Sequence, residues 1–501
     1  MPNPTVLIIG AGLAGLAAGC YAQMNGYRAR IFEHHRVAGG VAAHWSRGDY
    51  LIDGGIHFLM GYRPGTALHE VYRELGCERV PCVAMAHYGR YIDEIGGRRL
   101  DVTADLDRLA ADLRALSPAD SALIDELIAG TRAFRGLDVS AWGLAQPPEL
   151  QGPVDRVKDM WQMRTLWKYF TGRYAQSVAD FTRDVREPWL RDVLRSLFLP
   201  DAPVWFVFML LALLADGQLG LLAGGCGDFV GALERRFQDL GGEIAFRATV
   251  EEILVDNDHA VGVRLTDRTV HRGDIVVSAA DGYSTLFGML GGRYLTDAIH
   301  ERYDKWKLFP PLVMLSFGVA REFAGQPTFL TAFLKRPFTV IDRPVRSAFV
   351  RLFNYSDRFA PPGKSVVQVG FESEWEHWVG LRERGRDAYE AEKDHLAADV
   401  LRWLEHHYPG LSSQVEVTDV ATPYTTWRYT LNYRGAFEGW LLSPEQVNAR
   451  IERTLPGLSG FYMAGQWVMP GGGVPACLYS GRHAVQLLCR RAGKSFATTL
   501  P

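Results

Sequence analysis

The sequence predicts an α/β protein in which a Rossmann-like, two-dinucleotide-binding domain is interleaved with a mixed α+β domain. Three features support this class. An apolar run at residues 6–9 leads into Gly10-Ala-Gly-Leu-Ala-Gly15, a second run ends in Glu33, and another apolar segment followed by glycines stands at 461–473. A strand, a glycine-rich turn, a helix and a second strand ending in an acid are typical of a dinucleotide-binding βαβ unit.

Each residue type of the first unit has a physical role. Gly10 ends the strand, Gly12 lets backbone approach a pyrophosphate, and Gly15 lets the next helix press against the sheet. Glu33 is placed to accept the ribose hydroxyls. An ordinary tight turn is the alternative, because glycine-rich turns are common. The nucleotide contacts expected here come from Gly10, Gly12, Leu13, Ala14, Gly15, Glu33 and His34.

The residues after Glu33 favour FAD over NAD. The pair Gly39-Gly40 lies just past the acid, and Asp53-Gly-Gly-Ile-His57 follows it. Paired glycines let the chain pass close to a diphosphate, whereas NAD domains usually go directly into the next βαβ unit. Further contacts are expected from Gly39, Gly40, Val41, Gly55, Ile56 and His57.

The C-terminal region supports the same cofactor. Residues 461–465 read as a buried strand, and three glycines at 471–473 precede Pro475 and a helical pattern. Such a helix N-terminus can stabilise negative charge on a reduced flavin by roughly 0.3–2 kcal/mol. The contacts expected from this region come from Gly465, Gln466, Gly472, Gly473 and Val474.

Together these motifs resemble the phytoene desaturase branch of the flavin-containing amine oxidase superfamily, which also includes carotenoid isomerases and retinol saturases. The resemblance extends to 53–57, 116–120, 224–228, 241–243, 277–281, 422–423, 428–429 and the C-terminal glycines. It implies FAD as cofactor, a lipophilic isoprenoid or polyene substrate, a backbone contact to adenine at Val250, and a cofactor position for Ala279. Val41 stands where the family usually has Arg, and Gln466 where many members have an acid or a small residue.

The chain is long and apolar enough for two domains in one compact unit, with 501 residues of which 48% are hydrophobic. A formal charge of −3 provides no basic field for nucleic acid, and the six cysteines show no metal-ligand spacing. We therefore expect no metal and no nucleic-acid partner. The N-terminus reads as strand and helix rather than signal peptide, which places the protein in the cytoplasm. Peripheral contact with the inner face of the membrane and the oligomeric state stay open.

The pattern along the chain predicts how the domains interleave. Segments 1–75, 225–295 and 441–495 are assigned to the FAD-binding domain, and 76–224 and 296–440 to a substrate domain with a helical cap. Asp228 is placed to cap a helix that Gly241 ends. A hairpin is expected at 249–265, turning at 256–258, and a strand at 275–278.

The most hydrophobic segment, 204–215, allows two interpretations. As a helix of twelve residues it would reach about 18 Å, too short for a ~30 Å hydrocarbon core. It is either a buried helix or cavity wall, or a lip that dips into a membrane with Phe206 and Leu210 facing outward.

The chemistry is assigned to the flavin, because the sequence has no GxSxG elbow, metal-ligand cluster or Cys/His pair. His57 is the first candidate for proton transfer, with hydrogen-bonding support as the alternative. Arg428 and Tyr429, with Tyr433, form the second catalytic candidate, for an anionic flavin or a substrate headgroup, and surface packing is their alternative.

Three functions remain open at this point. The first is desaturation or saturation of a carbon–carbon bond of a lipophilic substrate by hydride transfer to or from the flavin. The second is a redox-neutral isomerase that needs reduced FAD, and the third is a lipid-binding flavoprotein without turnover. Amine oxidation is less favoured, because no aromatic cage is evident.

Overall fold

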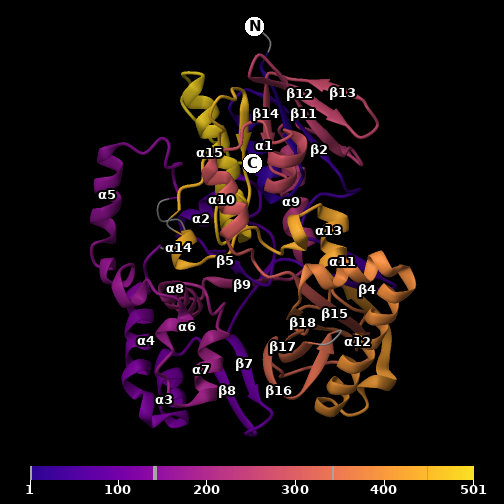
Figure 1. The fold of residues 1–501 in the computed structure, drawn as a ribbon. Helices are drawn as coiled ribbons and strands as arrows, with labels where there is room; N and C mark the ends of the chain where they lie inside the picture. The colour runs from indigo at the N-terminus through magenta and orange to yellow at the C-terminus, as the bar shows by residue number, and fades with distance from the viewer. Residues whose placement is uncertain (1–2, 139–143, 341–342, 448) are drawn as a thin grey trace.

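The structure, a computed structural model, describes residues 3–138, 144–340, 343–447 and 449–501 (Figure 1). Its first layer is a parallel sheet of five strands in the order β10-β2-β1-β14-β20. These strands span Glu243–Phe246 (β10), Arg28–Glu33 (β2), Thr5–Ile9 (β1), Ile275–Ser278 (β14) and Phe461–Met463 (β20). The predicted strands from both ends of the chain thus join one sheet, and the α/β class is confirmed.

Strand β1 separates two cores, because successive side chains point to opposite faces of a sheet. Val6 and Ile8 belong to a core with helices α1, α2, α9 and α15. Leu7 and Ile9 belong to a core with the antiparallel strands β11 and β12, and β13 pairs with β12. The bounds are Leu13–Met24 (α1), Ala67–Glu74 (α2), Cys226–Asp239 (α9), Gly473–Arg491 (α15), Val250–Asp256 (β11), His259–Leu265 (β12) and Val270–Arg272 (β13).

Local predictions around this sheet are confirmed with one correction. The β11–β12 hairpin turns at Asn257 and Asp258, both with positive φ. Gly241, with φ of 87°, follows the end of α9. Asp228 is not the N-cap of α9, because Gly225 holds that position, and Asp228 lies in the first turn, paired with Arg358.

The second layer is a sheet of seven strands in the order β19-β15-β18-β17-β16-β7-β8. Its neighbours are antiparallel except for β16 and β7. Helices α11 and α12 share an apolar core with this sheet. The bounds are Val415–Ala421 (β19), Leu312–Val319 (β15), Ser365–Glu372 (β18), Arg343–Leu352 (β17), Phe329–Val340 (β16), His87–Asp93 (β7), Arg98–Thr103 (β8), Trp375–Arg384 (α11) and Arg386–His407 (α12).

A helical layer lies beside the β7–β8 hairpin and shares one apolar core with it (Figure 1). It contains Leu106–Leu116 (α3), Ser121–Phe134 (α4), Val178–Phe181 (α6), Pro188–Arg195 (α7) and Val204–Ala215 (α8). We call this layer the cap, and its assignment to a substrate domain stays a prediction.

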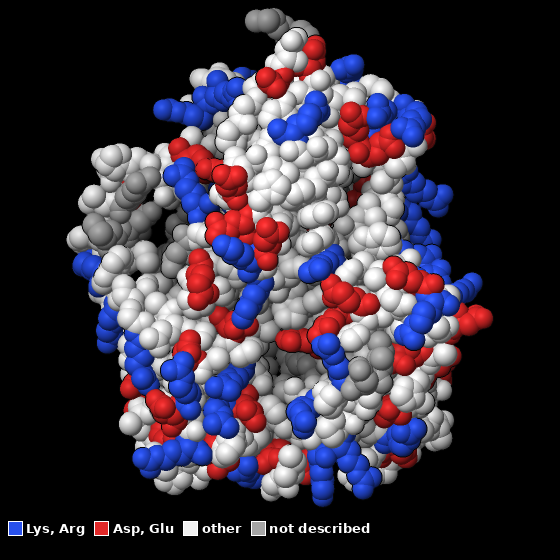
Figure 2. All heavy atoms as spheres, in the orientation of Figure 1, with Lys and Arg blue, Asp and Glu red and all other residues white. Residues whose placement is uncertain are grey.

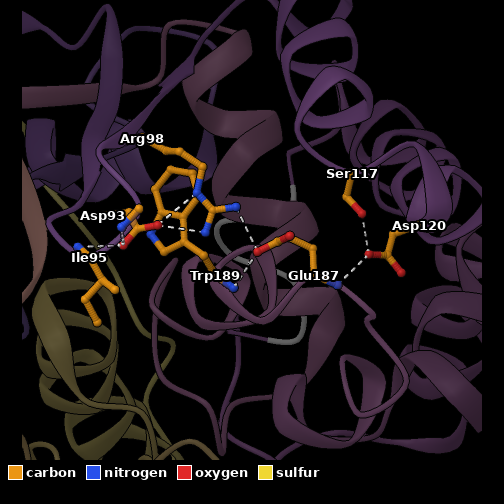
Figure 3. A network of polar contacts seen from close by, with 8 residues as sticks. Asp93, Ile95, Arg98, Ser117, Asp120, Glu187 and Trp189 are labelled. Carbon is orange, nitrogen blue, oxygen red and sulfur yellow. Dashed lines mark hydrogen bonds and ion pairs between the residues drawn. The ribbon is translucent and has the colours of Figure 1, made fainter.

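Polar contacts attach the cap to the hairpin (Figure 3). Arg98 pairs with Asp93 at 2.7 Å and with Glu187 at 2.9 Å. The backbone N–H of Glu187 donates to Asp120 at 3.1 Å, and the Ser117 hydroxyl donates to the same carboxylate at 2.7 Å. The motif at 116–120 therefore has a structural role in joining cap helices.

The strands of the two large sheets come from separate sets of segments. All five strands of the parallel sheet come from 1–75, 225–295 and 441–495, and all seven of the second sheet come from 76–224 and 296–440. We keep the division into two domains along these segments as a proposal. Three short strands connect the parts, since Leu59–Met60 (β5) and Cys82–Ala84 (β6) both pair with Leu219–Leu222 (β9).

Helix α8 is a buried cavity wall. Leu210 is 2% exposed, and both Phe206 and Leu210 line the central cavity, so the expectation that they face outward is wrong. Neighbouring cap helices cover the other side of α8. Within the described ranges, no helix is long and apolar enough to cross a membrane. The other α-helices and strands are Pro153–Met163 (α5), Asp297–Lys305 (α10), Pro423–Thr430 (α13), Pro444–Val447 (α14), His44–Arg47 (β3) and Tyr50–Asp53 (β4).

Candidate functional site

A cavity of about 1690 Å³ extends from β1 and the start of α1 to strands β16–β18 and helix α8. Ordinary small-ligand sites measure roughly 300–1000 Å³. The cavity therefore has room for a dinucleotide and a second ligand. Acidic and basic side chains are mixed over the face of the molecule in Figure 2, so no wide field of one sign covers that face.

Almost every residue predicted to contact the nucleotide lines this cavity. Gly15 is the exception, because a methyl group built on it would lie 1.9 Å from the Gly10 carbonyl oxygen. Gly15 thus packs α1 against the turn, as the sequence predicts. The lining residues are Gly10, Gly12, Leu13, Ala14, Glu33, His34, Gly39, Gly40, Val41, Gly55, Ile56, His57, Val250, Ala279, Gly465, Gln466, Gly472, Gly473 and Val474.

The two N-terminal glycine motifs lie side by side. Gly12 and Gly39 form an isolated parallel bridge, and the Gly39 N–H donates to the Ala11 carbonyl at 2.9 Å. Gly39 has φ of 125°, a conformation that L side chains rarely adopt. A methyl group on Gly12 would meet no protein atom closer than 4.0 Å. A larger residue at position 12 would therefore occupy cavity space without a clash that disturbs the fold.

Glu33 is held at the edge of the cavity. Its carboxylate accepts the backbone N–H of Ala11 at 2.7 Å and of His35 at 2.6 Å. Burial raises the pKa of Glu33, and these two hydrogen bonds oppose that shift. Each carboxylate oxygen keeps a further lone pair, which a ribose hydroxyl can occupy. Beside it, His34 Nδ1 contacts the Thr249 hydroxyl at 2.7 Å, directly before Val250.

The C-terminal glycines form another part of the cavity wall. Gly471, Gly472 and Gly473 have φ of 90°, 55° and 75° at the N-terminus of α15. The cradle of glycines, the acid at the end of β2 and this helix terminus together fit FAD, because each leaves space or charge that a dinucleotide needs.

His57 lies in the cavity and contacts two aromatic rings. Its ring is 5.4 Å from that of Phe349 and stacks on Phe437 at 5.9 Å and 18°. Burial, with the nearby Arg351, lowers the pKa of His57 to about 3. The expectation that His57 titrates near neutrality is wrong, because burial favours the neutral imidazole.

The motif that precedes His57 is anchored by a buried ion pair. Arg351 Nη2 lies 3.2 Å from Asp53 Oδ2, and the Cys226 N–H donates to Asp53 Oδ1 at 2.9 Å. The Ile56 N–H in turn donates to the Cys226 sulfur at 2.9 Å. Asp53 therefore fixes the start of α9 and, through Cys226, the backbone next to His57.

Glu438 is a cavity residue that the sequence reasoning missed. A methyl group built on Gly472 would lie 2.7 Å from the Glu438 Cβ and 3.1 Å from its Oε2. Burial raises the pKa of Glu438 to about 8. Its position between Phe437 and Gly439, in a segment without regular structure, gives no periodic signal. The only available signal was a lone acid in an otherwise apolar stretch shortly before the C-terminal strand.

Arg428 and Tyr429 do not reach the cavity. Both are exposed on α13, with Tyr429 44% exposed, and neither lines the cavity. The Tyr429 ring packs edge-on against His35 at 5.1 Å, and Tyr433 stacks on Tyr283 at 4.3 Å. The prediction that Arg428 and Tyr429 act at the flavin or the substrate is wrong, because both side chains are exposed and neither lines the cavity.

The part of the cavity beyond His57 has a wall rich in aromatic and aliphatic side chains. Strands of the second sheet and helix α8 supply most of these side chains, and charged residues, Arg343, Arg346 and Glu372 among them, line the same cavity. The wall includes Phe58, Tyr88, Trp205, Phe206, Met209, Leu210, Phe309, Met314, Phe329, Phe333, Phe349 and Phe371.

Cysteine and metal chemistry have no site among the described residues. The six cysteines are free thiols, and Cys226 is buried with its pKa raised by burial. In the part of the chain that the structure describes, no three His, Cys, Asp or Glu side chains gather as metal ligands.

Comparison with known proteins gives one family match. The family described as flavin containing amine oxidoreductase matches residues 13–489. Similar proteins include the chloroplastic prolycopene isomerase of Arabidopsis thaliana, 24% identical over 95% of this chain and 81% of the relative. The neurosporene-forming phytoene desaturase of Rhodobacter capsulatus is 25% identical over 96% of this chain and 93% of the relative.

Solved structures share the fold at low identity. An oxidoreductase from Methanosarcina mazei superposes with a TM-score of 0.61 at 18% identity, covering 96% of this chain and all (100%) of that one. Cyclohexylamine oxidase from Brevibacterium oxydans gives a TM-score of 0.61 at 14% identity, covering 98% of this chain and 100% of that one. These similarities concern the fold alone.

Proposed function

The chain belongs to the flavin containing amine oxidoreductase family and is an FAD-dependent oxidoreductase, and we propose that it desaturates or saturates a carbon–carbon bond of a lipophilic isoprenoid or polyene molecule. The observation that carries this proposal is the single cavity, in which the dinucleotide cradle continues into an apolar wall. The aromatic and aliphatic side chains of that wall suit a hydrocarbon chain, because burying apolar surface is favourable.

The chain's own residues would bind, orient and shield the reactants. Bound FAD supplies the group that accepts or returns a hydride. The rings of Phe349 and Phe437, both next to the neutral His57, offer flat surfaces against which a conjugated chain can lie. Apolar side chains from α8 and β16–β18 exclude water from the reacting carbons. His57 then acts as a neutral support rather than as a charged acid.

Relatives are named as desaturases and as isomerases, so both a redox reaction and a redox-neutral isomerisation are considered. Anaerobic mixing of the oxidised and of the pre-reduced FAD-loaded protein with phytoene and related polyenes in detergent distinguishes them. Substrate-dependent bleaching of the flavin supports desaturation, and oxidation of pre-reduced flavin by a polyene supports saturation. Product that forms only after prior reduction, without net flavin oxidation, supports the redox-neutral isomerase. No change with any polyene would favour a lipid-binding flavoprotein.

We also propose peripheral membrane contact, through α5 rather than α8. Val154, Val157 and Trp161 are 80%, 59% and 63% exposed and share one face of the helix. Helix α5 stands apart from the body at the left of Figure 1, and Leu144 and Pro148, in the segment before it, line the cavity. An exposed apolar helix face joined to the cavity suits entry of a substrate dissolved in lipid.

A further inference from the structure

We propose that Glu438 is the proton-carrying group of the site, and that it takes up a proton when a flavin ring bound against the N-terminus of α15 is reduced. The inference rests on the proposed function only in requiring FAD at this end of the cavity. It does not depend on which substrate delivers the electrons.

The geometry places the carboxyl at the glycine run. Its Oε2 would lie 3.1 Å from a methyl group on Gly472, and its Oε1 3.7 Å from one on Gly473. Both glycines begin α15, whose free N–H groups carry the positive end of the helix dipole. Among the cavity-lining side chains closest to these glycines, Glu438 is the one with a carboxyl group. A flavin ring bound against the glycines would therefore lie next to that carboxyl.

The carboxyl has no polar partner. Among the described residues, no hydrogen bond or ion pair reaches its oxygens, and desolvation alone accounts for its raised pKa, about 8. The neighbouring groups do not compete for the proton. Cys477 on α15, which interacts electrostatically with Glu438, has a thiol pKa raised to about 12, and His57, which stacks on the adjacent Phe437, is neutral.

The sign of the coupling follows from charge. Below pH 8 Glu438 is protonated in both redox states and takes up no proton. Above pH 8 it is ionised beside the oxidised ring, and two added electrons place negative charge next to it, which raises its pKa further. One proton from solvent then binds the carboxylate for every two electrons. No bond to carbon forms at Glu438.

The test is a redox titration of the holoprotein with dithionite between pH 6 and 10. In the wild type, the equilibrium constant for flavin reduction should fall by an additional factor of ten per pH unit above pH 8. For a two-electron couple this lowers the reduction potential by about 30 mV per pH unit. Glu438→Gln should lose this break. Glu372→Gln, a change at another cavity carboxyl whose pKa burial also raises, should keep it. A wild-type curve without the break, or a break that persists in E438Q, overturns the proposal.

Two further measurements keep the outcome decisive. If E438Q does not retain FAD, Glu438→Asp replaces it, and an unmoved break in that variant also overturns the proposal. The infrared difference spectrum upon reduction at pH 9 should show a protonated carboxyl appearing in wild type and in E372Q. Because dithionite supplies the electrons, failure of every polyene to react would refute the proposed function without affecting this result.

Discussion

Arg351 of the second sheet and Asp53 of the dinucleotide-binding half form an ion pair of 3.2 Å in which both side chains are 0% exposed. The pair lies where strand β17 meets the segment that leads to His57. Nη2 of Arg351 also donates to the Tyr355 hydroxyl at 2.8 Å, while Nε and Nη1 of Arg351 have no partner among the described residues. This ion pair therefore joins the dinucleotide-binding half to the second sheet, and each buried charge depends on the other half for its partner.

Replacing Arg351 with Met should strongly destabilise the protein. The change leaves the Asp53 carboxylate buried without its cation, at a cost of about 3–5 kcal/mol. Urea denaturation of the FAD-loaded protein measures the loss. Arg47→Met is the matched control, because Arg47 also pairs with an aspartate, Asp419, but is 49% exposed. That control should lose no more than about 1 kcal/mol, and equal losses in the two variants would contradict the account.

Gly12 and Gly15 should respond oppositely to the same substitution. Gly12→Ala should fold normally but retain little FAD, because its methyl group enters the diphosphate path and contacts no protein atom closer than 4.0 Å. Gly15→Ala should fail to fold, since its methyl group would lie 1.9 Å from the Gly10 carbonyl. Circular dichroism and flavin absorbance of the purified variants separate the effects. Full FAD retention in Gly12→Ala would show that the diphosphate runs elsewhere.

Acid should destabilise the native protein through His57. Its pKa is lowered to about 3 from an ordinary 6.5, so the unfolded chain binds a proton that the native site resists. Stability is therefore lost as the pH falls from 6.5 towards 3, by at most about 1.4 kcal/mol per pH unit for this group.

His57→Gln should reduce the pH dependence of stability in urea denaturation between pH 7 and 4.5, and the part due to His483, whose pKa burial also lowers to about 3, should remain. The exposed His87, changed to Gln, serves as the control and should leave the wild-type slope. If H57Q keeps that slope, His57 titrates normally and its use as a charged acid is restored.

Helix α5 should govern binding to lipid vesicles. Val157→Asp with Trp161→Asp places charge on its exposed apolar face and should abolish sedimentation with phosphatidylcholine liposomes, with the flavin spectrum unchanged. Ile95→Asp is the control, because Ile95 is 74% exposed on the distant β7–β8 turn. Membrane contact through α5 is refuted if the double variant sediments like wild type.

Local sequence patterns predicted the elements that depend on residues close together in the chain. The βαβ unit, the hairpin turning at Asn257 and Asp258, and helix α8 all follow from glycine placement and apolar periodicity. Which side a residue faces is set by tertiary packing instead. The sequence therefore could not show that Arg428 faces solvent or that Glu438 faces the cavity.

Local sequence patterns also could not predict which distant segments of the chain come into contact. The Arg351–Asp53 contact joins residues 298 positions apart, and the Gly12–Gly39 bridge depends on how two loops meet. Burial then changed the chemistry of His57, whose ordinary pKa had suggested proton transfer near neutrality. Residue type gives a group's usual titration, and only the fold gives the environment that moves it.

The central claim is that FAD and a long apolar molecule share one cavity, and mass spectrometry of the purified protein tests it most directly. Wild type should release FAD together with an isoprenoid or polyene hydrocarbon. Thr331→Trp, which adds bulk to the cavity wall on β16 beside Phe349, should keep FAD and lose the hydrocarbon. Release of FAD with only polar metabolites, or the same hydrocarbon content in the variant, would contradict the account.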